Sequence, residues 1–294
     1  MRKKLLFIYN PHAGKGMIRG KLSEIIETFV LAEYEVTIFS TRGRHDATYI
    51  VKEKAKEYDL IACSGGDGTL NEVTVGLMQC EKRPPCGFIP AGTTNDVANS
   101  LKIPKNMKKA AELIVNGTHF PFDMGTINED YFIYVAGFGA FTDVSYGTPQ
   151  SSKNILGRLA YLLEGAKRLP TIKSYRFTVY YEDQVIEDDF IFGMISNSNS
   201  IGGFKGLSGK NVKLDDGLFE VSLIKMPKNP VDLQAIINSL IIGEPNPKYF
   251  YSFPTAEITL SSDEMVPWTI DGEFGGNLKD VVIQNQKHAI TFIN

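Results

Sequence analysis

Strand-like runs alternate with segments of helical periodicity through the first third of this sequence. The runs are short and mostly apolar, as in strands covered on both faces, and each is followed by residues at the spacing of an amphipathic helix. Repeated strand–helix units joined by short loops predict a parallel sheet with helices on both faces. The expected strands are residues 4–9, 34–40, 60–63 and 86–89, and the expected helices are residues 22–32, 47–57, 70–78 and one that begins over 96–101.

The pattern changes near Asp123, where β-rich runs separated by turn residues take over. Such runs are typical of an antiparallel sandwich or barrel. We therefore predict an α/β domain over residues 1–122 and a mostly antiparallel β-sandwich domain over residues 123–294. In the second domain the expected strands are residues 131–136, 174–181, 185–196, 218–224, 256–261, 281–284 and 289–293, and the expected helices are 154–168 and 230–242.

Composition narrows the range of functions. The formal net charge of −3 at pH 7 lacks the basic excess of nucleic-acid-binding proteins, so we expect no nucleic-acid partner. The three cysteines form no C-x-x-C pair, which favours a reducing, cytoplasmic compartment over a disulfide framework. The apolar start of the chain stops at Asn10-Pro11, and we interpret it as a first strand rather than a signal peptide. No stretch approaches the roughly 18 apolar residues that span a bilayer.

The strongest local signal is the loop of residues 65–69 (Gly-Gly-Asp-Gly-Thr), which joins an apolar strand to a helix. Glycines let backbone N–H groups approach an anion closely, and a helix N-terminus adds aligned donors and a partial positive charge. Thr69 and Glu72 have the spacing of a capping box, which predicts Thr69 as the N-cap. The loop is therefore expected to hold phosphate groups.

Asp67 refines this prediction. A carboxylate next to phosphate is repulsive unless a cation lies between them, so its presence indicates Mg²⁺ on the phosphates of ATP. A tight strand-to-helix turn with Asp67 as a local cap is the alternative. The loop is not a Walker A motif, and no G-x-G-x-x-G follows a strand, which disfavours an ordinary dinucleotide site.

Two further loops support a phosphate site. Residues 10–14 (Asn-Pro-His-Ala-Gly) follow the first predicted strand, and residues 90–96 follow the fourth. In a parallel sheet both loops open at the same carboxyl edge as residues 65–69. Three such loops at one edge are hard to explain as turns alone.

Together these segments resemble the diacylglycerol kinase catalytic domain, which is shared with sphingosine and ceramide kinases. The bacterial soluble diacylglycerol kinases and YegS-like lipid kinases look most similar, and the resemblance covers essentially the whole chain. Each segment alone is unspecific, whereas the ordered set is highly specific. The segments are Asn10-Pro11 with Gly14, Gly65 to Glu72, Gly92 to Asp96, Asp215-Asp216-Gly217 and Asp271-Gly272-Glu273.

The resemblance implies an ATP-binding first domain, similar in fold to NAD kinases and phosphofructokinases. It also implies a β-rich second domain and an active site between the two. Asp67 would lie near the metal and the γ-phosphate. The implied nucleotide site consists of Asn10, Pro11, His12, Ala13, Gly14, Thr41, Gly65, Gly66, Asp67, Gly68, Thr69, Leu70, Asn71, Glu72 and Thr93.

Glu273 is, by the same resemblance, the base that accepts the proton of the lipid hydroxyl, and Asp67 and Asp271 are the other two catalytic candidates. A carboxylate suits that role where it reaches the hydroxyl. Asp271 and Glu273 follow a strand-like run, so a plain Asp-Gly hairpin turn is the alternative, and the residues alone leave the two interpretations about even.

A structural Mg²⁺ is implied at Asp216, with backbone oxygens near Lys213 and Leu218 as further ligands. A hairpin turn is again the alternative. Relatives commonly carry a Pro-x-Ala segment where this chain has Leu-Ser-Gly-Lys at 207–210, so the resemblance does not fix the shape of that loop.

The predicted function is ATP-dependent transfer of the γ-phosphate to a lipid hydroxyl, first of all that of diacylglycerol, which gives phosphatidic acid. A kinase of a soluble acceptor such as NAD and a non-catalytic nucleotide or lipid sensor stay open as alternatives. The basic, amphipathic segment 154–169 could lie on anionic lipid, with a core-facing helix as the alternative. We expect a cytoplasmic protein that is transiently at the inner face of the membrane, and the oligomeric state stays open, with a homodimer among the options.

Overall fold

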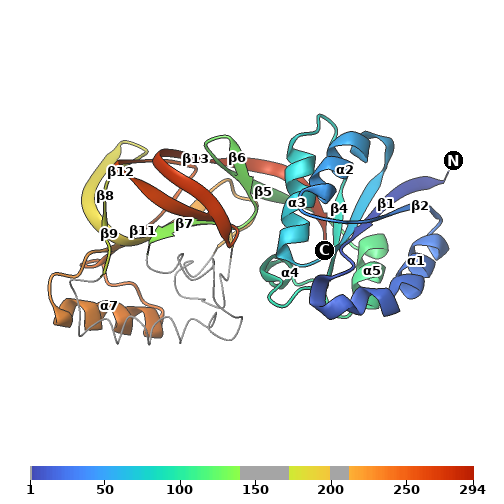
Figure 1. The fold of residues 1–294 in the computed structure, drawn as a ribbon, viewed down its shortest axis with the longest axis horizontal. Coiled ribbons are helices and arrows are strands. Elements are labelled where there is room, and N and C mark those ends of the chain that lie inside the picture. Colours follow the sequence, from blue (N-terminus) through green and yellow to red (C-terminus); the bar gives the residue numbers. More distant parts are fainter. Residues whose placement is uncertain (1, 140–171, 199–211) are drawn as a thin grey trace. The chain divides into compact units, whose positions relative to one another are not determined.

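The computed structural model describes residues 2–139, 172–198 and 212–294, which form two compact units (Figure 1). The first unit contains Met1–Met124 and Lys287–Asn294, and the second contains Gly125–Gln286. The predicted division at 122 lies close to this boundary, but the prediction placed the C-terminal residues in the second domain. They belong to the first unit because Phe292 pairs with Cys86, and because Asn294 exchanges backbone hydrogen bonds with Thr118. The predicted helix 154–168 and the segment 207–210 lie outside the described residues.

A parallel sheet forms the centre of the first unit. Its strands β1 (Lys3–Tyr9), β2 (Tyr34–Ser40), β3 (Leu60–Gly65) and β4 (Cys86–Pro90) follow the order β4-β3-β1-β2. β3 and β4 are buried along their whole length, as continuous apolar strands in a covered parallel sheet should be. The carboxyl ends of these strands therefore lie at one edge of the sheet.

Helices pack around this sheet in pairs, α1 with α5 and α2 with α3 (Figure 1). The apolar spacing of α1 buries Ile25 and Phe29, and the Phe29 ring meets the Phe7 ring of β1 edge-on at 5.6 Å between centroids. The helices are α1 (Leu22–Leu31), α2 (Asp46–Lys54), α3 (Asp67–Met78), α4 (Asp96–Ser100) and α5 (Met107–Asn116), with 3₁₀ segments η1 (Ala13–Gly20) and η2 (Ala55–Glu57).

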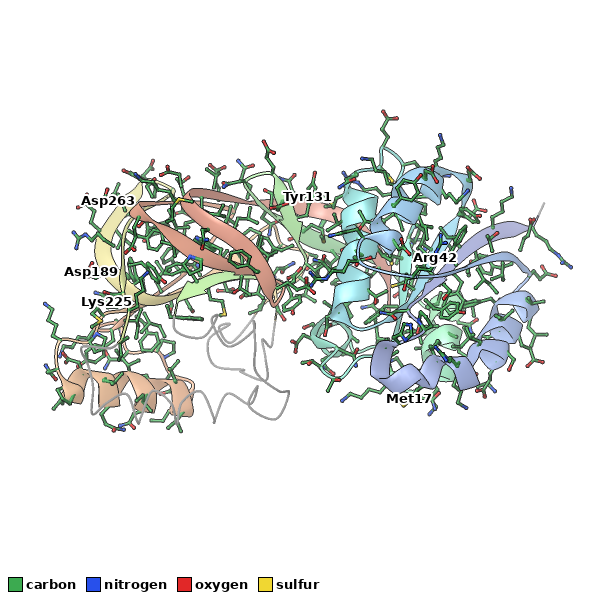
Figure 2. All side chains as sticks on the ribbon, in the orientation of Figure 1. Met17, Arg42, Tyr131, Asp189, Lys225 and Asp263 are labelled. Carbon is green, nitrogen blue, oxygen red and sulfur yellow. The ribbon has the colours of Figure 1, made fainter. Side chains whose placement is uncertain are left out.

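Antiparallel pairing builds the second unit, in agreement with the predicted β-rich domain. The core centres on Trp268, whose ring lies 5.0 Å from that of Phe138. Charged side chains such as Asp189 and Lys225 are partly exposed on neighbouring strands (Figure 2). The strands from the domain boundary onward are β5 (His119–Ile127), β6 (Asp130–Phe132), β7 (Val135–Gly139), β8 (Tyr175–Tyr181), β9 (Gln184–Ser196), β10 (Phe219–Lys225), β11 (Phe250–Thr255), β12 (Glu257–Ile270) and β13 (Glu273–Ile293).

The strand order of this unit is β11-β10-β9-β7-β12-β13, and β8 pairs with both β9 and β12. β13 is one long strand where the sequence predicted two short ones, because its first half pairs with β12. Its last residues belong to the first unit, where Phe292 lies beside β4.

Helix α7 (Pro230–Ile242) has the predicted bounds. Asn229 caps it by accepting the N–H of Asp232 at 2.9 Å, and Pro230 suits the first turn because its missing N–H is not needed there. Gly243 ends the helix with a φ of +75°. Among the described residues, no helix is both long and apolar enough to cross a membrane.

The hairpin between β12 and β13 turns on Asp271-Gly272. Ile270 faces Glu273 across the ladder, so the loop has two residues, and both have positive φ, +47° and +84°. Positive φ at both positions is the signature of the type I′ turn that Asp-Gly favours. The hairpin interpretation of this segment is therefore correct for the backbone.

Asp271 also anchors the tip of this hairpin to the start of β7. Its carboxylate accepts the backbone N–H groups of Ile133, Tyr134 and Val135 at 2.8, 3.0 and 3.1 Å. The Tyr134 hydroxyl donates to the Asp271 carbonyl at 3.1 Å, and the Asp271 N–H donates to the Val135 carbonyl at 2.8 Å. The side chain thus has a structural task that the sequence analysis did not foresee.

Asp271→Ala is expected to destabilise the second unit, because three backbone N–H groups would lose a charged acceptor. Hydrogen bonds to charged groups contribute about 1.5–3 kcal/mol each, so we expect to lose roughly 3 kcal/mol or more of unfolding free energy. Denaturant or thermal unfolding measures the loss. Asp263→Ala, which removes an exposed carboxylate of β12 (Figure 2), is the matched control and should change little. Equal stability of the two variants would contradict the anchoring role.

Candidate functional site

Three loops meet at the carboxyl edge of the parallel sheet. Backbone hydrogen bonds join them: the Asn10 N–H donates to the Ser64 carbonyl at 2.9 Å, and the Ala91 N–H donates to the Gly65 carbonyl at 2.7 Å. The side-chain amide of Asn10 also donates to the Thr69 hydroxyl at 3.4 Å. The expected convergence of the loops that follow β1, β3 and β4 is thus observed.

Glycine is required where these loops touch. Gly14 has a φ of +54°, and a Cβ built there would lie 1.9 Å from the carbonyl oxygen of Ala91. A Cβ on Gly92 would lie 2.6 Å from the Cα of Gly66. No side chain tolerates such distances, so the backbones approach this closely only as glycine. Bare backbone at a helix N-terminus is also what the close approach of a phosphate needs.

Helix α3 begins at Asp67, with Gly66 as its N-cap. The N–H groups of Thr69 and Leu70 donate to the Gly66 carbonyl at 3.0 and 3.1 Å. The capping-box prediction is therefore wrong: Thr69 lies inside the first turn, and the Glu72 carboxylate accepts N–H groups at the start of α2 instead. Because a glycine N-cap brings no side-chain acceptor, the first turn of α3 is suited to an acceptor from outside, such as phosphate.

Asp67 carries a partly buried carboxylate at this edge. Within the described part of the chain, its Oδ1 atom is buried and has no hydrogen-bond partner. Burial raises the pKa of Asp67 above its ordinary value, and the backbone N–H groups of Asn95, Val97 and Asp96 oppose this only in part. The ionised carboxylate is therefore poorly stabilised by the protein alone. A divalent cation beside it would relieve the cost, so the residues present fit Mg²⁺ on a bound nucleotide.

Asn95 shapes the loop after β4, although it was not among the predicted nucleotide contacts. Its backbone is left-handed, with a φ of +53°. Its Oδ1 accepts the Gly92 N–H at 3.0 Å, and its Nδ2 donates to the Gly92 carbonyl at 2.7 Å. Asn is one of the few residues besides glycine that enters this region readily, so an Asn just before the helix start was the available signal.

The predicted site residues are divided between the two units. Those of the second unit are the catalytic and structural-metal candidates Asp271, Glu273, Lys213, Asp216 and Leu218. The first unit contains the nucleotide candidates: residues 10–14, Thr41 and Thr93 come after the ends of β1, β2 and β4, and residues 65–72 run from the end of β3 into helix α3.

Glu273 is the first residue of β13 and is exposed, so a substrate can reach its carboxylate. Asp216 forms a local turn: its Oδ1 accepts the Leu218 N–H at 3.0 Å, and Gly217 has a φ of +86°. Burial, and then the neighbouring charge of Asp216, raise the pKa of Glu220. No three His, Cys, Asp or Glu side chains gather into a metal-binding group in the described ranges, whereas the predicted structural site uses one carboxylate with backbone oxygens.

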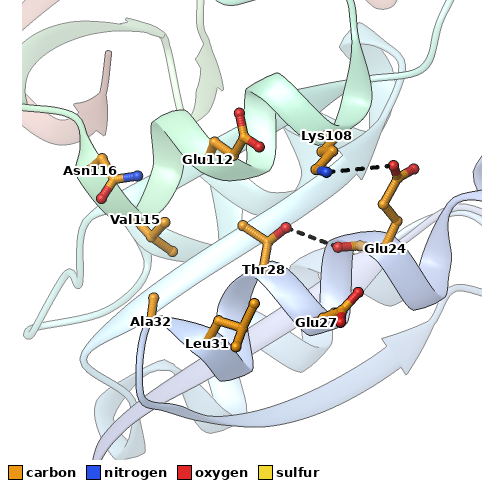
Figure 3. A pocket seen from close by; sticks show the side chains of 9 residues that line it. All are labelled: Glu24, Glu27, Thr28, Leu31, Ala32, Lys108, Glu112, Val115 and Asn116. Atoms are coloured by element: carbon orange, nitrogen blue, oxygen red, sulfur yellow. Dashed lines mark hydrogen bonds and ion pairs between the residues drawn. The ribbon is translucent and has the colours of Figure 1, made fainter.

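A separate pocket lies between helices α1 and α5 (Figure 3). It has a volume of about 390 Å³ and is lined by none of the predicted nucleotide residues. Its polar groups bind one another: the Thr28 hydroxyl donates to the Glu24 carbonyl at 2.9 Å, and Lys108 Nζ lies 4.0 Å from the Glu24 carboxylate. The phosphate-loop edge, not this pocket, is therefore the candidate site.

The sequence is similar to those of known proteins. Residues 4–127 match the family model of the diacylglycerol kinase catalytic domain. The chain is 34% identical over 289 residues to the diacylglycerol kinase of Bacillus subtilis (strain 168), covering 97% of this chain and 95% of that protein. It is also 34% identical over 291 residues to the diacylglycerol kinase of Staphylococcus carnosus (strain TM300), covering 98% of this chain and 94% of that protein.

A solved structure is similar over both units. The crystal structure of a diacylglycerol kinase from Bacillus anthracis str. Sterne aligns with a TM-score of 0.78 at 28% identity, covering 99% of this chain and 97% of that one. Sequence and fold thus agree along nearly the full length. The chain belongs to the diacylglycerol kinase family of lipid kinases.

Proposed function

We propose that this protein transfers the γ-phosphate of ATP to the free hydroxyl of diacylglycerol, giving phosphatidic acid and ADP. The observation that carries the proposal is the buried Oδ1 of Asp67, which the described residues leave without a partner beside loops that meet through glycine. A carboxylate in that state suits a metal-bound nucleotide. Family membership supports a lipid acceptor, since the relatives compared are called diacylglycerol kinases.

In this proposal the first unit is the nucleotide-binding domain, with a fold like that of NAD kinases and phosphofructokinases. Backbone N–H groups at the start of α3 and in the loops after β1 and β4 bind the phosphates. Thr41 and Thr93 lie at the same edge and complete the predicted contacts. Asp67 would hold Mg²⁺, which, when bound, neutralises part of the triphosphate charge.

At phosphorus the transfer forms one bond and breaks one, and a proton moves from the acceptor hydroxyl to a base. The hydroxyl oxygen of the acceptor bonds to the γ-phosphorus while the bond from that phosphorus to the bridging oxygen of ADP breaks. Glu273 accepts the hydroxyl proton as its exposed carboxylate meets the acceptor. Asp271 already accepts three backbone N–H groups, so we assign it to holding the hairpin that carries Glu273 rather than to proton transfer.

Two accessory features belong to the proposal. Asp216 would hold a structural Mg²⁺ together with backbone oxygens of Lys213 and Leu218, since carboxylate and carbonyl oxygens are the ligands that hard cations prefer. The acceptor resides in a bilayer, so the protein would act from the cytoplasm, transiently at the inner face of the membrane.

Glu273→Gln tests the base. The amide keeps the shape of the side chain but cannot accept a proton at neutral pH, so transfer to diacylglycerol should fall on the order of 10²-fold or more. Labelled ATP with diacylglycerol in mixed micelles, followed by extraction, measures the product. Glu264→Gln, which changes an exposed glutamate of β12, is the control and should retain activity.

The same assay tests the acceptor. Label in the organic phase supports the proposed function, and activity should rise when anionic lipid presents the acceptor at an interface. Label found only in an aqueous dinucleotide when NAD is offered would show a soluble-acceptor kinase. ATP binding with no transfer to any acceptor would show a sensor.

Asp67→Asn is expected to separate activity from stability. Transfer should fall on the order of 10²-fold or more, because the carboxylate that would hold the metal is gone. Without nucleotide, the melting temperature at neutral pH should rise, since burial raises the pKa of Asp67 and its ionised form therefore opposes folding. This advantage should shrink as the pH falls and the parent carboxyl takes up a proton. Unchanged turnover with unchanged Mg²⁺ dependence would make Asp67 a turn residue only.

Asp216→Ala tests the structural metal. If Mg²⁺ binds the folded second unit, adding Mg²⁺ without nucleotide should raise the melting temperature of the parent protein, because a ligand that binds only the native state stabilises it. The variant should lose this Mg²⁺-dependent shift and some activity with it. If Mg²⁺ does not change the melting temperature of the parent protein, the proposal of a structural metal at Asp216 is wrong.

A further inference from the structure

Glu72 was predicted as a nucleotide contact, but its carboxylate is engaged within the protein. Its Oε1 accepts the His45 N–H at 2.9 Å, and its Oε2 accepts the Ala47 N–H at 3.2 Å. Both amides lie at the start of α2, where the side chain of the N-cap residue His45 makes no capping hydrogen bond with any described residue. Glu72 of α3 therefore caps a helix other than its own, and its charge is favourable at that N-terminus.

The backbone at His45 depends on such support. Its φ of +66° lies in the left-handed region, which costs free energy for a residue with a Cβ. A conformation of this kind persists only where its surroundings fix it. The Glu72 carboxylate fixes the His45 N–H, and the Asp46 carboxylate braces the same loop by accepting the Arg42 N–H at 2.7 Å.

Beyond Glu72, helix α2 packs against the same face of α3. Gly76 lies one turn after Glu72, and a Cβ there would come within 2.8 Å of the Thr48 carbonyl oxygen and of the Val51 Cβ. The Thr48 hydroxyl donates to the Glu72 carbonyl at 2.9 Å. α2 thus approaches α3 as closely as glycine permits, and Glu72 occupies the end of this contact that faces the loop after β2.

This loop, residues 41–47, is held at both ends. At its start the Thr41 N–H donates to the Tyr9 carbonyl at 2.9 Å, next to the loop of residues 10–14. At its end Glu72 binds His45 and Ala47. The sheet therefore holds the end of the loop that lies beside residues 10–14, and Glu72 holds the opposite end. Glu72 belongs to α3, the helix whose first turn is expected to bind phosphate.

We propose that Glu72 is a positioning residue, which fixes residues 41–47 on α3 and so places Thr41 at the nucleotide site, without contacting the nucleotide itself. The identity of the nucleotide rests on the proposed function. Losing the carboxylate frees two amides and a strained residue, so the loop must be ordered again when ATP binds, and this cost lowers affinity. An interaction of that kind weakens binding more than it slows the chemical step.

Glu72→Ala and Glu72→Gln test the inference against Glu53→Gln as the control, a glutamate of α2 whose carboxylate accepts the Tyr49 hydroxyl. Calorimetry with ATP and Mg²⁺, without acceptor, gives the dissociation constant directly. For Glu72→Ala we expect that constant and the KM for ATP to rise about tenfold, with a smaller fall in kcat. Glu72→Gln should lie between the parent and Ala, because its single carbonyl oxygen can still accept one of the two N–H groups.

Hydrogen exchange supplies a readout independent of activity. In Glu72→Ala the amides of His45 and Ala47 should exchange faster, while those in the middle of α3 keep their protection. If Glu72→Ala binds ATP as tightly as the parent protein, the positioning role is wrong. The same holds if Glu72→Ala loses kcat alone and Glu72→Gln does not restore it. A parent protein that binds ATP but phosphorylates no lipid would refute the proposed acceptor alone. One that binds no nucleotide would refute both proposals.

Discussion

The first unit depends on close backbone contact between loops at the carboxyl edge of its parallel sheet, which glycine residues make possible. β1, β3 and β4 end beside one another, so their loops must pass within a space that accommodates no Cβ at Gly14 or Gly92. Hydrogen bonds between the loops, such as that from Ala91 to Gly65, become possible only because the chains come so close. The close approach of the loops also places backbone N–H groups where they can donate to an anion. The packing of this edge and its expected phosphate binding therefore both depend on that close approach.

A site built in this way carries a cost. The loops that bring N–H groups together also remove water from Asp67, and burial is the largest influence on its pKa. A neutral side chain at this position would suit the unliganded fold better. Binding sites often contain an interaction that is unfavourable in the unliganded protein and that the ligand relieves. A substitution that removes such an interaction can therefore raise stability while it lowers activity.

The sequence predicted what depends on local pattern. Buried apolar strands and amphipathic helices of the first unit are set by periodicity, and α7 has the predicted bounds because Pro230 and Gly243 mark both ends. Long-range pairing was not predictable. The sequence near residue 292 does not indicate that Phe292 lies beside Cys86. β13 was predicted as two strands because its middle is polar, and its continuity depends on pairing with β12.

The candidate site shows the same limit. Its glycines, Asp67 and the loop order were evident from the sequence, and their convergence followed from parallel topology. The capping box was a wrong prediction because Thr69 and Glu72 have the right spacing but Glu72 turns to a neighbouring helix, and spacing along one chain carries no information about that neighbour. Asn95 lies in the motif Gly92 to Asp96, but its role was not predicted, because that role depends on a left-handed backbone.

Hydrogen bonding separates acidic residues that look alike in sequence. Asp67, Glu72 and Asp271 all lie in or beside loops of the family motifs, and each was a candidate for contact with ligand or chemistry. The Glu72 carboxylate accepts two backbone N–H groups, and the Asp271 carboxylate accepts three. Either side chain would have to break these hydrogen bonds in order to contact a ligand. Asp67 differs, because its buried Oδ1 has no such partner among the described residues. Backbone N–H groups near the start of α4 stabilise the Asp67 carboxylate only in part. A carboxylate whose two oxygens both accept hydrogen bonds within the fold supports the site, whereas one with a buried oxygen that has no partner is suited to bind a cation.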